Sequence, residues 1–80
     1  MTLTIYGMQT CPACMWAKQT LSRNKTPFKY VELGVDLPHI EFRQAFPEVT
    51  RLPAIYEGSN LLDWGQFIAQ YTTGNQNNAS

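Results

Sequence analysis

The chain has 80 residues, of which 44% are hydrophobic and 15% are charged. This length accommodates one small domain with a single core, and it excludes a large barrel, a repeat array or two separate domains. Six basic residues balance six acidic ones, so the basic excess that is typical of nucleic-acid binding is absent. Two cysteines are too few for a secreted disulfide scaffold, and no stretch has the roughly 18 apolar residues of a membrane span.

The first part of the chain predicts a strand, a helix and a second strand. Residues 2–6 alternate in polarity and contain β-branched and aromatic side chains, as strands do. Pro12 suits the first turn of a helix that runs to about Lys25, because a proline there lacks only an N–H that would be unpaired anyway. Residues 28–33 predict the second strand. This order favours a parallel pair of strands joined by a right-handed crossover.

The second part predicts a short helix, a hairpin and a final helix. The helix covers residues 39–46, where aromatic side chains recur at helical spacing. Residues 53–57 predict a third strand, and a turn leads into a short fourth strand that begins at Leu61. Asp63 and Gln66 form a capping-box pattern at the start of the last helix. The order β-α-β-α-β-β-α predicts an α/β fold with a four-stranded mixed sheet flanked by three helices.

Composition also divides the chain. We expect one domain over residues 1–72 and a disordered tail over residues 73–80, since the tail is polar and rich in asparagine. The amino terminus lacks the basic and apolar regions of a secretion signal. We therefore expect a cytoplasmic protein.

A C-x-x-C motif, Cys11-Pro12-Ala13-Cys14, lies where the first loop meets the first helix. Residues three apart on a helix have Cβ atoms about 5–6 Å apart, which suits a reversible disulfide. Partial positive charge at the helix start stabilises a thiolate on Cys11, and the thiolate is the attacking species. We therefore predict Cys11 as the nucleophile and Cys14 as the resolving thiol. Lys18, on the same helical face, is expected to add supporting positive potential.

Other uses of the two cysteines are weaker. A zinc site usually needs four cysteine or histidine ligands, and the chain offers two cysteines and His39, so we predict no metal site within one chain. A structural disulfide would close a very short loop, which stabilises little. Two unreactive core thiols remain possible, but an exposed loop-helix junction is a poor place for them.

Several motifs resemble the glutaredoxin family, and the stretch over residues 35–49 resembles small bacteriophage glutaredoxins in particular. The motifs that carry the resemblance lie at residues 5–7, 10–14 and 52–56. The resemblance as a whole covers about residues 3–71. The resemblance implies a thioredoxin-like fold and thiol-disulfide exchange, with glutathione as a co-substrate and no bound cofactor. It also implies a cis peptide between Leu52 and Pro53 that faces the cysteines, and the host cytoplasm as the location if a phage encodes the protein.

The resemblance also suggests residues that would bind the substrate or glutathione. They are Tyr6, Pro12, Ala13, Arg51, Leu52, Pro53, Asp63 and Trp64. The chain departs from the family pattern at four places. Met8 stands where many glutaredoxins have lysine, Ala13 where many have tyrosine, Arg51 where threonine is usual, and the segment 63–65 where a Gly-Gly pair approaches glutathione.

Three functional hypotheses follow. The first is a dithiol glutaredoxin, acting as a monomer, that reduces disulfide-containing client proteins such as ribonucleotide reductase. The second is a redoxin of similar sequence that thioredoxin reductase reduces in place of glutathione. The third is a binding module in which Cys11 of two chains shares a metal ion or an iron–sulfur cluster with external thiols. Neither nucleic acid nor a membrane is an expected partner.

Overall fold

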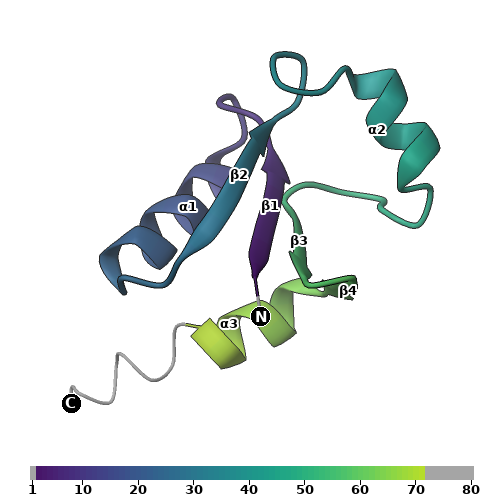
Figure 1. Ribbon diagram of the computed structural model, residues 1–80. Coiled ribbons are helices and arrows are strands. Elements are labelled where there is room, and N and C mark those ends of the chain that lie inside the picture. Colours follow the sequence, from purple (N-terminus) through teal and green to yellow (C-terminus); the bar gives the residue numbers. More distant parts are fainter. Residues whose placement is uncertain (1, 72–80) are drawn as a thin grey trace.

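The computed structural model describes residues 2–71 and contains every predicted element. The strands and helices follow one another in the predicted order (Figure 1). The elements are β1 (Leu3–Gly7), α1 (Pro12–Arg23), β2 (Phe28–Glu32), α2 (His39–Ala45), β3 (Ala54–Glu57), β4 (Asn60–Leu62) and α3 (Trp64–Tyr71). The predicted boundary at residue 72 and the predicted tail over residues 73–80 lie outside the described residues.

The four strands form one mixed sheet in the order β2-β1-β3-β4. β1 and β2 are parallel, with Gly7 opposite Glu32, which confirms the predicted parallel pair. β3 and β4 form the predicted antiparallel hairpin, with Ile55 opposite Leu62. β1 also pairs with β3 in antiparallel orientation. β1 is a central strand, and a short loop connects its end to the C-x-x-C motif.

Alternation along β1 separates two hydrophobic clusters, one on each face of the sheet. Leu3 and Ile5 are buried on one face, together with Ala17 and Leu21 of α1 and Phe67 of α3. The opposite face carries a second cluster, which α2 covers. Its members include Leu33, Phe42, Ala54 and Tyr56, with Tyr6 packed against them. The sheet is therefore the middle layer, with α1 and α3 on one side and α2 on the other (Figure 1).

Local hydrogen bonds determine where α1 and α3 begin and end. α1 ends at Arg23, two residues before the predicted end, because Lys25 takes a left-handed conformation with φ of 58°. Asn24 then donates its side-chain amide to the Tyr71 carbonyl at 2.8 Å, which ties the ends of α1 and α3 together. The capping box of α3 is confirmed, as Asp63 and Gln66 each bond the backbone N–H of the other.

α2 is short and is anchored by one buried side chain. Phe42 is buried, whereas Ala45, which shares its helical spacing, is exposed. The helix ends at Ala45, one residue before the predicted end. None of the helices described in residues 2–71 is long and apolar enough to cross a bilayer.

Candidate active site

The loop after β1 brings Cys11 to the start of α1. The backbone N–H of Cys11 donates to the Met8 carbonyl at 3.1 Å, which closes the loop into a turn. Cys11 has extended backbone angles at the N-cap, and Pro12 is the first helical residue, as predicted. The Cys11 thiol is partly exposed. The backbone N–H of Cys14 donates to Cys11 Sγ at 3.2 Å, so the sulfur itself caps the helix.

Cys14 lies one turn further along and is fully buried. Burial raises the pKa of its thiol to about 12, and the neighbouring Cys11 side chain and the Glu32 carboxylate add to the increase. A backbone hydrogen bond from Met8 opposes it. Both cysteines are thiols in this structure. The two sulfurs therefore differ strongly in environment although they occupy one helical turn.

Gly7 allows the first turn of α1 to approach the end of β1. A Cβ atom on Gly7 would lie 2.9 Å from both Cβ and Sγ of Cys14, which is closer than such atoms ever pack. The same atom would lie 3.2 Å from the Tyr30 hydroxyl. The absence of a side chain here lets the Cys14 sulfur sit directly against the sheet.

A polar group on β2 lies behind Cys14, and sequence reasoning missed it. The Glu32 carboxylate accepts the Tyr30 hydroxyl at 3.0 Å and the backbone N–H of Gln9 at 2.8 Å. Lys18 Nζ lies 4.3 Å from the centre of the Tyr30 ring. Tyr30 and Glu32 are two apart in a predicted strand and so share a face. That spacing is a usable signal, but only the parallel pairing with β1 brings the face to Cys14.

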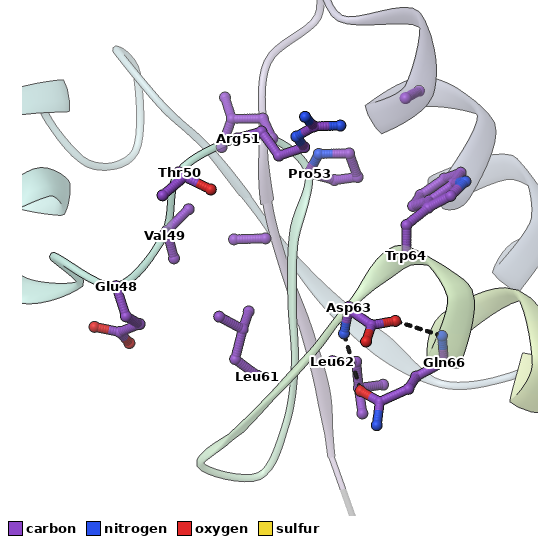
Figure 2. A pocket seen from close by; sticks show the side chains of 13 residues that line it. Glu48, Val49, Thr50, Arg51, Pro53, Leu61, Leu62, Asp63, Trp64 and Gln66 are labelled. Carbon is purple, nitrogen blue, oxygen red and sulfur yellow. Dashed lines mark hydrogen bonds between the residues drawn. The ribbon is translucent and has the colours of Figure 1, made fainter.

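A hollow of about 560 Å³ opens beside the motif, between the segment before β3 and the start of α3 (Figure 2). It contains six residues that the sequence predicted as binding or active-site neighbours. They are Ala13, Arg51, Leu52, Pro53, Asp63 and Trp64. The other lining residues, which the sequence did not predict as binding residues, come from these two segments and from β3 and β4. They are Glu48, Val49, Thr50, Ala54, Leu61, Leu62 and Gln66.

Some of the charged side chains of the hollow already have hydrogen-bond partners among the described residues, and one does not. Asp63 Oδ1 accepts the Gln66 N–H at 2.8 Å, so its carboxylate already caps α3. Glu48 accepts the Tyr56 hydroxyl. Arg51 is exposed, and no acidic side chain within residues 2–71 forms an ion pair with it. The hollow thus contains one cationic side chain in a lining of both polar and apolar residues.

The wall segments of the hollow are well defined. The Leu52–Pro53 peptide bond is cis, as predicted. Trp64 is 41% exposed, and its ring lies 5.6 Å from that of Trp16, which is 44% exposed. Figure 2 places Glu48 and Trp64 at opposite ends of the hollow.

The structure does not bring every predicted residue to this hollow. The Tyr6 side chain lies on the α2 face, because it alternates with Ile5 along β1. Its ring packs 5.0 Å from Phe46 and 5.2 Å from Phe42, which makes Tyr6 a packing residue rather than the cleft border that was predicted. Pro12 is exposed at the start of α1 and does not line the hollow. Within the described residues, no three potential metal-binding side chains gather.

Comparison with known proteins agrees with this architecture. The family model described as Glutaredoxin matches residues 3–61. A solved structure, glutaredoxin 1 from Francisella tularensis complexed with cacodylate, superposes with a TM-score of 0.67. The superposition covers 95% of this chain and 96% of that one, at 17% sequence identity, and so it shows the thioredoxin-like fold. No curated protein sequence matches the chain. The chain belongs to the glutaredoxin family and is a thiol-disulfide oxidoreductase.

Proposed function

We propose that the protein is a glutathione-dependent dithiol glutaredoxin in which Cys11 is the nucleophile and Cys14 the resolving thiol. The difference between the two sulfurs carries the proposal. Cys11 is partly exposed at a helix start, where its sulfur accepts the backbone N–H of Cys14. Cys14 is buried and stays protonated. A client disulfide can reach the first sulfur but not the second.

The reaction then proceeds by two exchanges. The Cys11 thiolate attacks one sulfur of the client disulfide, and the other client sulfur leaves as a thiolate. Cys14 next attacks the Cys11 sulfur, which forms the Cys11–Cys14 disulfide and releases the fully reduced client. Two glutathione molecules then return the protein to the dithiol state and become oxidised glutathione. Each step exchanges one S–S bond for another, so the electrons balance.

The hollow beside the motif is the proposed binding site for glutathione. The Arg51 guanidinium has the geometry to bind a glutathione carboxylate in a bidentate manner. The apolar side chains around Leu52 and Pro53 would cover the tripeptide backbone. Because Ala13 is one of the lining residues, the sulfur of a bound glutathione would lie close to the motif.

The second hypothesis, reduction by thioredoxin reductase, also has an observation in its favour. Met8 packs against the α2-side cluster, so no cation stands at this position before the motif. The Asp63 carboxylate is occupied in capping α3. Two contacts that glutathione commonly uses in the family are therefore altered. Ribonucleotide reductase remains the proposed client by analogy with the family, and the cytoplasm remains the proposed location.

An assay with two donor systems in parallel tests these alternatives. One contains NADPH, glutathione and glutathione reductase, and the other contains NADPH and thioredoxin reductase. We expect disulfide reduction with the first system. Activity with thioredoxin reductase alone would contradict the glutathione proposal and favour the second hypothesis. Colour or bound iron in the purified protein would instead favour the cluster-binding module.

A further inference from the structure

The resolving step needs a proton acceptor. Cys14 is fully buried, so bulk water does not reach its thiol. When Cys14 attacks the Cys11 mixed disulfide, its proton must leave, yet burial raises the pKa of this thiol to about 12. A free Cys14 thiolate is therefore scarce at neutral pH. A base close to the sulfur would remove the proton while the new S–S bond forms.

The structure places a proton path beside that sulfur. The Tyr30 hydroxyl and Cys14 Sγ flank the same small space next to Gly7, at 3.2 Å and 2.9 Å from where a Gly7 Cβ would lie. Tyr30 donates its own hydrogen to Glu32 Oε1 at 3.0 Å. Its oxygen lone pairs therefore remain for a second hydrogen bond in which it accepts. A hydrogen bond from the Cys14 thiol to this oxygen, made directly or through one water molecule, would complete the path.

We propose that Glu32 accepts the proton of Cys14 in the resolving step and that the Tyr30 hydroxyl relays it. This inference rests on the proposed dithiol function. As the Cys14 sulfur bonds to the Cys11 sulfur, its proton passes to the Tyr30 oxygen and the Tyr30 proton passes to Glu32. The bond between Cys11 and the client sulfur breaks, and the client leaves with the electron pair. Solvent then protonates the client thiolate and takes the proton from Glu32.

The surroundings of Glu32 suit this task. The titratable groups that interact with it are Tyr30 of β2, Asp36 of the following loop and Cys14 of α1, and Lys18 of α1 lies over the Tyr30 ring. The Asp36 carboxylate binds the backbone of Glu32 and not its side chain, because it accepts the Glu32 N–H at 2.9 Å. Gln9 N–H holds Oε2 at 2.8 Å, and this bond is solvent-exposed, which gives the proton a way out. The Lys18 cation over the Tyr30 ring stabilises negative charge that develops on the relay.

The test follows release of glutathione from protein whose Cys11 carries a preformed glutathione mixed disulfide. Glu32→Gln keeps an acceptor oxygen but cannot take up a proton. We expect it to slow release about 100-fold at pH 7. The wild-type rate should change little between pH 6 and 8, whereas the variant rate should rise about tenfold per pH unit, because it depends on spontaneous Cys14 ionisation. Tyr30→Phe should behave like Glu32→Gln.

A matched control is available in the same sheet. Glu57 accepts the Tyr71 hydroxyl at 3.0 Å. It pairs with Leu3, at the end of β1 that is far from Gly7. Glu57→Gln removes the same kind of carboxylate from a tyrosine and should release glutathione at the wild-type rate. Release by Glu32→Gln at the wild-type rate and with the wild-type pH profile would overturn the relay alone. Failure of the wild-type protein to release glutathione would overturn both the relay and the dithiol function.

Discussion

The Sγ atom of Cys11 accepts the backbone N–H of Cys14 at 3.2 Å, so the outer thiol caps the helix that holds the inner one. A side-chain acceptor at this position satisfies an N–H group that has no partner within the helix. The sulfur that accepts this bond is also the partly exposed one of the pair. One local contact therefore links the stability of α1 with the proposed nucleophile.

Replacement of either cysteine should separate the two exchange steps. Cys11→Ser should abolish disulfide reduction, because the buried Cys14 cannot reach a client. Cys14→Ser should stop dithiol turnover and leave a mixed disulfide on Cys11, detectable by intact-protein mass spectrometry. Reduction of protein disulfides by Cys11→Ser at more than a trace of the wild-type rate would contradict the proposed roles.

The free energy of unfolding of the reduced protein should fall at alkaline pH. Burial raises the pKa of Cys14 from 9.0 to about 12, so the unfolded chain releases this proton first. The stability that Cys14 contributes is complete below pH 9 and is lost as the pH rises toward 12. One group changes the free energy by at most about 1.4 kcal/mol per pH unit. Denaturant titrations at several pH values measure the change.

A comparison of the wild-type protein with Cys14→Ala isolates the contribution of the Cys14 thiol to the unfolding free energy. Tyr30, Tyr56 and Tyr71 also have raised pKa values, chiefly through burial, and they act in the same direction. In Cys14→Ala these tyrosines remain while the thiol is removed. The difference in unfolding free energy between the two proteins should therefore shrink above pH 9. A difference that is constant from pH 8 to 11 would show that Cys14 ionises as easily in the folded protein as in the unfolded one.

Gly7→Ala should destabilise the protein, since the added Cβ would lie 2.9 Å from Cys14 Cβ and Sγ. Overpacking of this kind typically costs about 1–3 kcal/mol. Gly65→Ala is the matched control, because its Cβ would meet only Asp63 Oδ1 at 3.4 Å within α3. That change should be neutral or stabilise by up to about 1 kcal/mol. Equal unfolding free energies for the two variants would argue against the tight contact.

Arg51→Gln should raise the KM for glutathione severalfold and leave kcat nearly unchanged, because it removes the cation proposed to hold a carboxylate. Arg43→Gln is the control. Arg43 lies on α2 and does not line the hollow beside the motif; it lines a neighbouring hollow of about 540 Å³, which shares Arg51 and Leu52 with the first one. Steady-state kinetics with varied glutathione distinguish the two variants. Equal KM values for wild type and Arg51→Gln would move the glutathione site away from Arg51.

The starts of two helices could be predicted from the sequence because they depend on residues that are close together in the chain. Cys11 and Pro12 identify the start of α1, and Asp63 and Gln66 identify that of α3, since each pair acts within one helical turn. Tyr6 shows the limit of such reasoning. Its closeness in sequence to the motif suggested a place in the cleft, but strand alternation turns it toward α2.

The order of strands and helices and the place of the C-x-x-C motif at a helix start could both be predicted from the chain alone. Both follow from residue types and spacings that act over one turn or one strand. The position of β1 between β2 and β3 became known only from the folded chain. That arrangement brings Glu32 and Tyr30 behind Cys14 and brings Arg51 and Trp64 into one hollow. These residues meet through packing of the whole sheet, which no short stretch of sequence specifies.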